Sequence, residues 1–504
     1  MWVRKGILAL LAAACLGASS PIGVEYGHSG ITGDDESAAM LARSGIGTVK
    51  FADVFWSDVQ PWDFASWCSI WPFSLISTCS YQWSALDADM QTWQRAGFTD
   101  IHMVLRAKHP NFTTRTVTPP PAFGIYVNLA SNPPKADRWD DYGRFVAAVA
   151  ERYDGDGVND MPGLKTPVHA YEIESEQQTG QWWGGTVAEH LQLTRTARAS
   201  ILAADPRARI ILGGVNFGNN LDDNPTLDQW LARLAGLPSP WNTIILNAVD
   251  FAEAELAASA ADAYDIVEIH ALSNWTGVAP AVQLLRNVML ANGFSKEIWI
   301  GDAASSPDLL FNANIGTIPY LPKDDLARRA SILLNPSTSN TYLTTVAWIR
   351  AEQSILTARK VAAAFGAGAR RINFCSPVDW PTISSLPFNG LLESSSGPDR
   401  PVLATLRLLA AATLSCSDST KVPADGDVPS ATFVQANPAV YVFETRCGGR
   451  FVLAWSDSGA VRVQPPIPIT SAVQVPTVMG QSSGTPVPIV DGGFQVDRVP
   501  VLAR

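Results

Sequence analysis

The chain has 504 residues, of which 47% are hydrophobic and 16% are charged, and this composition is typical of a globular protein rather than a disordered or collagen-like chain. The formal net charge of -11 argues against a broad phosphate-binding surface, so we expect no nucleic-acid partner. Seventeen Trp residues are a high number, and the flat indole ring suits both core packing and stacking on sugar faces.

The N-terminal segment has the pattern of a secretory signal peptide. Its first residues, MWVRKG, carry positive charge, and the apolar run that follows is much shorter than the ~20 residues needed to span a bilayer. We therefore assign residues 1–20 to a signal peptide and expect a secreted or cell-envelope protein, periplasmic or extracellular. Cys15 follows three alanines and loosely resembles a bacterial lipoprotein box, so a lipid anchor through Cys15 is the alternative to simple secretion.

Five further cysteines follow the signal peptide. An exported chain meets an oxidising compartment, so we expect disulfides between Cys68 and Cys79, which flank a short aromatic loop, and between Cys416 and Cys447. Cys375 lies in the apolar stretch RRINFCSPV and is expected to be a buried thiol, because nothing nearby would lower its pKa. The six histidines lack the companion spacing of a zinc site, so we predict no catalytic metal and no required cofactor.

Short apolar runs of strand length alternate with amphipathic helical stretches along most of the chain. The predicted strands are residues 22–26, 47–51, 100–105, 168–174, 209–214, 264–270, 297–301 and 370–375, and three of the predicted helices are 138–153, 187–206 and 344–368. Eight such repeats predict an α/β fold, a closed (β/α)8 TIM barrel, with a doubly wound open sheet as the alternative.

The pattern changes after a last predicted helix over 400–414. Short strands separated by Gly, Pro and Ser follow, and they are typical of an all-β domain, here a sandwich. The predicted organisation is therefore a signal peptide over 1–20, a catalytic barrel over 21–410 and a C-terminal β-sandwich over 411–504. The sequence indicates no oligomeric state.

Acidic residues lie at the ends of two predicted barrel strands, where the chemistry of such barrels resides. In HAYEIESEQ, residues 169–177, Glu172, Glu174 and Glu176 alternate and would share one strand face. A single Glu there would be solvated or salt-bridged, but three on one face are unusual. The strand KEIWIGD ends at Asp302. Two carboxyl groups facing each other are what glycoside hydrolysis needs, because one protonates the leaving oxygen while the other attacks or activates water.

Several of these segments together resemble clan A glycoside hydrolases, retaining β-glycosidases on (β/α)8 barrels that include β-xylosidase-like members. YEIESEQ resembles their W-E-I-x-N-E-P signature at the end of strand four, and EIWIGD resembles strand seven, which normally ends in the nucleophilic Glu. GIGTVKFADVFWSDVQP and YDIVEIHALS resemble strands two and six, and the all-β tail resembles the accessory sandwich. Position by position, the resemblance implies that Glu176 is the acid/base and that Asp302 takes the place of the nucleophile.

The chain departs from the family pattern at four positions around this site. Ser175 stands where the family has Asn, Asp302 where it has Glu, Lys50 where it has Arg, and Leu272 where strand six usually supplies a Tyr. Asp is one methylene shorter than Glu, so the carboxyl gap could widen from about 5 Å towards the roughly 6.5 Å that admits an inverting water. Retention of the anomer therefore does not follow from the resemblance. These departures also leave a catalytically inactive carbohydrate-binding barrel as the alternative function.

Other side chains are expected to support a carbohydrate substrate. An acid at position 176 needs a pKa raised by burial and by the charges of Glu174 and Asp302. Glu172 is expected to pair with Lys50 or Arg106 as structural support. The predicted substrate-binding residues are Ser175, Lys50, His270, Trp182, Trp183 and Trp380, with loop or core packing as the alternative for His270 and for Trp182 and Trp183.

One loop has alternating oxygen ligands and glycines. Asp154, Asp156 and Asp160 in DGDGVND are compatible with a structural calcium ion, although the loop lacks the terminal Glu of an EF-hand, and a tight polar turn is the alternative. The chain contains no phosphate loop, dinucleotide fingerprint or nucleophile elbow, so phosphoryl transfer, hydride transfer and serine hydrolase chemistry have no support.

Overall fold

The computed structural model describes residues 20–26, 35–63, 81–114, 131–180, 182–217, 221, 225–236, 241–272, 274–304, 318, 320–336, 341–375, 377–379, 388–393, 397–414, 430–445 and 449–504. Apart from Ser20, the predicted signal peptide with Cys15 lies outside the described residues. The four cysteines of the two predicted disulfides, Cys68, Cys79, Cys416 and Cys447, lie outside them as well, as does Trp380.

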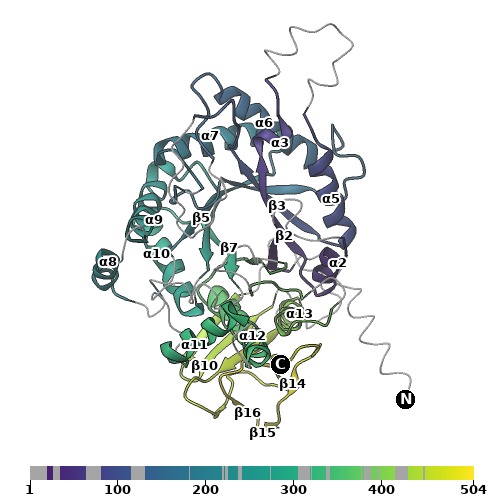
Figure 1. Cartoon of the computed structure of the whole chain (residues 1–504), viewed down its shortest axis with the longest axis vertical. Helices are drawn as coiled ribbons and strands as arrows, with labels where there is room; N and C mark the ends of the chain where they lie inside the picture. Colours follow the sequence, from purple (N-terminus) through teal and green to yellow (C-terminus); the bar gives the residue numbers. More distant parts are fainter. Residues whose placement is uncertain are drawn as a thin grey trace.

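Eight parallel strands close into a barrel in the order in which they occur along the chain (Figure 1). They are β1 (Ile22–Tyr26), β2 (Thr48–Phe55), β3 (Asp100–Arg106), β4 (Val168–Ile173), β5 (Arg209–Asn216), β6 (Ile266–Ala271), β7 (Glu297–Ala304) and β8 (Ile372–Cys375). The predicted TIM barrel is therefore confirmed, and the open-sheet alternative is wrong because β1 pairs with β8.

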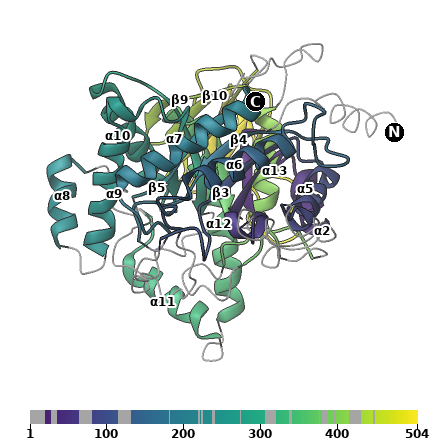
Figure 2. The same cartoon turned by 90° about the horizontal axis from the view of Figure 1, so that it is seen from above.

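Helices surround the barrel, and the views of Figures 1 and 2 show them as an outer layer. They are α2 (Asp35–Arg43), α3 (Trp56–Val59), α5 (Ser84–Ala96), α6 (Trp139–Tyr153), α7 (Val187–Ala204), α8 (Leu227–Gly236), α9 (Trp241–Glu255), α10 (Val278–Ala291), α11 (Lys323–Leu334), α12 (Tyr342–Gly366) and α13 (Pro401–Thr413). Two short 3-10 turns, η2 (Ala258–Ala260) and η3 (Trp275–Gly277), precede β6 and α10. Among the described helices, none is both long enough and apolar enough to cross a membrane.

The barrel interior changes from apolar to polar along its axis. A buried layer of Ala170, Ile211, Ile266 and Trp299, one residue from each of β4 to β7, fills the end where these strands begin. Further along the same strands the inward positions carry acids and bases, such as Glu172 on β4 and Glu268 on β6, both fully buried. The apolar layer closes one end, so the polar groups gather towards the carboxyl ends of the strands.

Two antiparallel sheets follow the barrel. One has the strand order β14-β13-β17-β11-β10-β9 and the other the order β12-β16-β15. Val442, Val452, Phe494 and Val496 come from both sheets and share one apolar core, which is the packing of a sandwich. The strands are β9 (Ser430–Ala436), β10 (Ala439–Glu444), β11 (Arg450–Trp455), β12 (Val461–Val463), β13 (Ala472–Gln474), β14 (Thr485–Pro486), β15 (Ile489–Val490), β16 (Gly493–Val496) and β17 (Val501–Ala503).

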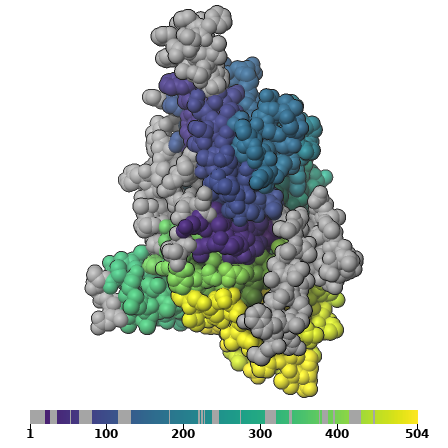
Figure 3. Space-filling view, turned by 90° about the vertical axis from the view of Figure 1, so that its right-hand side faces the viewer, coloured from purple at the N-terminus to yellow at the C-terminus, as the bar shows by residue number. Residues whose placement is uncertain are grey.

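The sandwich packs directly against the barrel helices. In Figure 3 the C-terminal residues form one end of the molecule beneath the green helical segment. Phe443 and Phe451 stack on each other, and Phe443 also packs against Phe365 of α12, so these rings belong to the same core as the barrel. The buried Arg359 of α12 pairs with Asp457 at 2.8 Å and lies over the ring of Trp455. Both apolar contact and the ion pair of the buried Arg359 therefore join the two parts.

Candidate active site at the barrel mouth

Glu176 and Asp302 both lie near Nδ1 of His270, at the carboxyl ends of the barrel strands. The Nδ1 atom of His270 lies 2.9 Å from Oε1 of Glu176 and 3.9 Å from Oδ2 of Asp302. His270 and Asp302 are neighbours across β6 and β7. The two carboxyl groups predicted from separate parts of the sequence therefore face one imidazole.

The separation of the two carboxyl groups is limited by their common neighbour. The two oxygens cannot be farther apart than the sum of their distances to Nδ1, which is below about 7 Å. Retaining glycosidases hold their carboxyl groups about 5–5.5 Å apart, and inverting enzymes hold them roughly 6.5–9.5 Å apart. The arrangement thus allows the retaining spacing and only the lower end of the inverting one.

Glu176 reaches this position through a strained backbone. Strand β4 ends at Ile173, and then Glu174 and Glu176 both adopt left-handed conformations, with φ of 61° and 45°. Residues other than Gly rarely adopt this backbone conformation, and such strain concentrates at functional sites. The amide of Glu176 donates to the carbonyl of Gly214 on β5, at 3.1 Å, which attaches the turn to the neighbouring strand.

The expectation that three acids share one strand face is wrong, because the regular alternation stops at Ile173. The carboxylate of Glu174 accepts a hydrogen bond from the amide of Ala107, at 2.6 Å, and pairs with Nε of Arg106, at 2.9 Å. Both partners belong to the end of β3 and the residue after it. Glu174 therefore links the turn after β4 to the end of β3. Of the three glutamates, only Glu176 faces Asp302.

The pKa of Glu176 is lowered, whereas the sequence predicted that it would be raised. Burial alone would raise the pKa of Glu176, but hydrogen bonds from His270 and from the side-chain amide of Asn216, at 3.0 Å, lower it. The predicted rise was wrong because these donors outweigh burial. Burial raises the pKa of Asp302, and the attraction of His270 only partly opposes that rise.

His270 carries the charge that balances these acids. Burial alone would lower its pKa, but the contacts with Glu176 and Glu268 raise it well above 6.5, so the ring is an imidazolium at neutral pH. A side chain at Gly214 would collide with this ring, since a Cβ there would lie 2.1 Å from its Cδ2. The glycine of β5 thus provides the space that the ring occupies.

Lys50 lies one layer below, where it cannot reach a sugar. It is 1% exposed, and its Nζ lies 2.8 Å from Glu172, 3.8 Å from Glu25 and in close contact with Glu268. The substrate-binding role predicted for Lys50 is therefore wrong, whereas the pairing expected for Glu172 is found. Burial raises the pKa of Glu172 to about 8, and Lys50 holds that of Glu268 well below its ordinary value despite burial.

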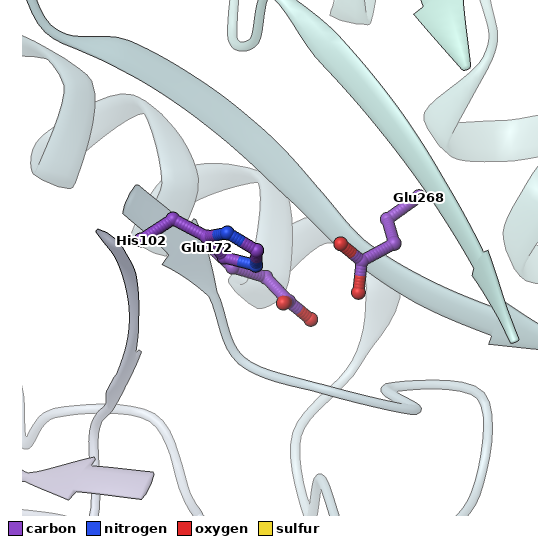
Figure 4. Close-up of side chains that lie close together, drawn as sticks. All are labelled: His102, Glu172 and Glu268. Atoms are coloured by element: carbon purple, nitrogen blue, oxygen red, sulfur yellow. The ribbon is translucent and has the colours of Figure 1, made fainter. Parts of the chain in front are cut away.

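A group with metal-ligand chemistry lies in the same layer. His102, Glu172 and Glu268 come from three strands and point toward one another, with ligand atoms within 4.8 Å (Figure 4). Burial lowers the pKa of His102 to about 3, which leaves its ring neutral. The ammonium of Lys50 contacts both glutamates, so a positive charge already lies within this cluster.

The acidic loop after α6 also brings its carboxylates together, with oxygens of Asp154, Asp156 and Asp160 within 4.8 Å of one another. Each carboxylate accepts backbone amides of the same loop, as when Asp160 accepts from Gly155 at 3.0 Å and Gly157 at 2.8 Å. These are the contacts of a tight polar turn. A structural calcium ion at these three residues stays a prediction.

Of the three tryptophans predicted to bind sugar, Trp182 and Trp183 are described, and only Trp182 is partly exposed. Trp183 is 2% exposed, packs against His190 and donates from Nε1 to the carbonyl of Thr186, so its proposed sugar contact is wrong and loop packing explains it. Trp182 is half-buried, and Arg106 lies 5.2 Å from the centre of its ring. Ser175 is half-buried in the strained turn. Trp380 lies outside the described residues.

Four residues of this site were missed in the sequence. Glu268 lies two positions before His270 on one strand, so period two could have placed both on the inner face. Glu25 and Asn216 lie near the ends of β1 and β5. Cys375, buried as expected, ends β8 beside Asp302, and its thiol donates toward that carboxylate.

Comparison with known proteins bears on the fold. No protein-family model and no curated protein sequence matches the chain. Among solved structures, the catalytic domain of GH30 xylanase C from Talaromyces cellulolyticus matches with a TM-score of 0.53 and 11% identity, over 96% of this chain and 95% of that chain. A conserved exported protein from Bacteroides fragilis matches with a TM-score of 0.54 and 10% identity, over 96% and 97%. A glycoside hydrolase family 30 subfamily 8 xylanase from Clostridium acetobutylicum matches with a TM-score of 0.49 and 10% identity, over 96% and 95%. At 10–11% identity, the two matches with TM-scores above 0.5 show a fold that is shared over nearly the whole of each chain.

Proposed function

We propose that the protein is an exported glycoside hydrolase that cleaves a β-linked glycan or glycoside with two carboxyl groups. Glu176 acts as the acid/base and Asp302 as the nucleophile or base, as the resemblance to β-xylosidase-like clan A enzymes implies. The single observation that carries the proposal is the convergence of both carboxyl groups on His270 at the barrel mouth. The fold supports it, because active sites of such barrels lie at this end.

The chemistry follows from the arrangement of the two groups. A proton from Glu176 passes to the glycosidic oxygen, the bond from that oxygen to the anomeric carbon breaks, and the carboxylate of Asp302 attacks the carbon. Water then attacks the anomeric carbon and breaks its bond to Asp302, and Glu176 takes up the proton that the water loses. The limited distance between the carboxyl groups favours this double displacement, in which the β-anomer is retained.

Substitution of the two acids tests the proposal. Aryl β-glycosides, with a good and a poor leaving group for each sugar, are offered to the wild type, Glu176→Gln and Asp302→Asn. We expect Glu176→Gln to lose about 100- to 10,000-fold in kcat/KM on the poor leaving group and much less on the good one, because only the former needs an acid. Asp302→Asn should lose activity on both.

The control is Asp262→Asn, which changes a carboxylate whose side chain is 78% exposed and should leave the rate unchanged. Full activity of either active-site variant would contradict the assigned role. If the folded wild type quenches its Trp fluorescence on sugar binding yet hydrolyses nothing in the panel, the carbohydrate-binding barrel without catalysis is the correct function.

The stereochemistry is a separate prediction. Proton NMR of the first product formed from an aryl β-glycoside should show the β-anomer, which then mutarotates. Initial appearance of the α-anomer would mean that water attacks directly and that the two carboxyl groups open beyond the separation found here.

A further inference from the structure

We propose that His270 is a positioning residue that stores the proton which Glu176 delivers to the leaving group. This inference rests on the proposed function and extends it, because the resemblance assigns no such role to the residue at this position. His270 itself does not touch the reacting atoms and acts through Glu176.

The contacts of both ring nitrogens support this role. Nδ1 lies 2.9 Å from Glu176, and Nε2 lies 3.6 Å from Glu268, so each nitrogen faces a carboxylate. A ring in that position carries protons on both nitrogens, because an ionised carboxylate accepts a hydrogen bond and cannot donate one. The proton on Nδ1 points at the oxygen of Glu176 that must become protonated.

The buried ion pair of Glu268 and Lys50 lies beside Nε2 of His270. Glu268 is fully buried and contacts the ammonium of Lys50, so its negative charge persists and holds the imidazolium in place. On the β5 side the ring packs against Gly214, where any side chain would displace it. His270 is 6% exposed, which protects the pair from water.

Charged groups surround the imidazole from five strands of the barrel. They are Glu25 of β1, Lys50 of β2, Glu172 and the following Glu176 of β4, Glu268 of β6 and Asp302 of β7. The contacts with Glu176 and Glu268 raise the pKa of His270, and the hydrogen bond and positive charge of His270 in turn lower the pKa of Glu176.

The proton transfer balances at each step. In the first step Nδ1 gives its proton to Oε1 of Glu176, which passes a proton to the glycosidic oxygen as the bond to the anomeric carbon breaks. The sugar alcohol leaves, and His270 is left neutral. In the second step the attacking water loses its proton to Glu176, and that proton returns to Nδ1. No other reactant is needed.

The pH profile of the rate distinguishes this role from a merely structural one. Below neutrality the rate should fall as Asp302 becomes protonated, and above neutrality it should fall only when His270 loses its proton, at a pH well above 6.5. His270→Asn keeps a hydrogen-bond donor to Glu176 but stores no proton, so the alkaline limb of kcat/KM should move down by at least about one pH unit. His169→Gln, a half-buried histidine paired with Asp205, is the matched control and should not move it.

An NMR titration of the imidazole tests the same inference without turnover. In the wild type the His270 resonance should titrate well above pH 6.5, and in Glu176→Gln its pKa should fall. If His270 titrates at or below 6.5, or if His270→Asn leaves the alkaline limb in place, the inference about His270 is wrong while the two-carboxylate function stands. If no glycoside is cleaved, the proposed function itself fails.

Discussion

At the scale of single residues, Lys50 explains how a barrel can keep so many acids in its interior. A carboxylate without a partner is costly to bury, and Lys50 offers its ammonium to Glu172, Glu268 and Glu25. It thereby holds Glu268 ionised, and Glu268 in turn attracts His270. The electrostatics of the mouth therefore depend on a cation that a substrate cannot reach.

Removal of that cation should destabilise the fold. Lys50→Met leaves buried carboxylates unpaired, and we expect the free energy of unfolding in urea at pH 7 to fall by about 3–5 kcal/mol. Arg195→Met, which breaks a pair between exposed side chains, should cost less than about 1 kcal/mol. A similar small cost for both variants would contradict the role of Lys50.

The deficit of Lys50→Met should also depend on pH. In the wild type, the lowered pKa of Glu268 contributes stability above its ordinary value of 4.5, and that contribution is lost as the pH falls through the folded-state pKa. The difference between wild type and variant should therefore be large at pH 7 and shrink below about pH 4.5, where the carboxyl groups can take up protons.

At the scale of elements, the barrel strands could be predicted because both faces of each strand are covered, so each strand reads as an apolar run. The predicted strand 22–26 coincides with β1, and the predicted strand 168–174 is one residue longer than β4. The division of the C-terminal segment GFQVDRVPVLA into β16 and β17 could not be predicted from its apolar pattern, because the two strands join different sheets.

The site could be predicted only as far as strand ends allow. Glu176 and Asp302 follow from the rule that chemistry gathers at the carboxyl ends of barrel strands. Their protonation could not be predicted, because it depends on contacts with His270 and Asn216 that form only when distant strands meet. Trp183 shows the same limit, since the sequence does not reveal which of two adjacent rings turns inward.

Helix α7, which packs on β4, offers a test of local stabilisation. Its N-terminus has a capping box, in which Thr186 accepts from the amide of Glu189, at 3.2 Å, and Glu189 accepts from the amide of Thr186, at 2.8 Å. Thr186→Ala removes one side of this exchange and should lower the free energy of unfolding by about 1 kcal/mol. Thr196→Ala, at a half-buried position inside the same helix, is the control and should change it little.

At the scale of the whole molecule, the sandwich contributes to the core of the barrel. Phe443 and Phe451 of the sandwich pack in the same cluster as Phe365, and the buried Arg359 finds its carboxylate in Asp457. Deletion of residues 415–504 would remove Phe443 and Phe451, expose Phe365 and leave Arg359 without Asp457. We expect the truncated chain to be insoluble or to bind a hydrophobic dye strongly, whereas a soluble, folded and active barrel would show that the sandwich is only an appended module.

The most direct test of the two-carboxylate mechanism is to trap its covalent intermediate. Once the panel of aryl β-glycosides has identified a sugar that is cleaved, its 2-deoxy-2-fluoro analogue is incubated with the full chain, and the labelled peptide is mapped by mass spectrometry. We predict one sugar attached to Asp302. Attachment to Glu176 or to any other residue, or turnover without a trapped sugar, would contradict the mechanism.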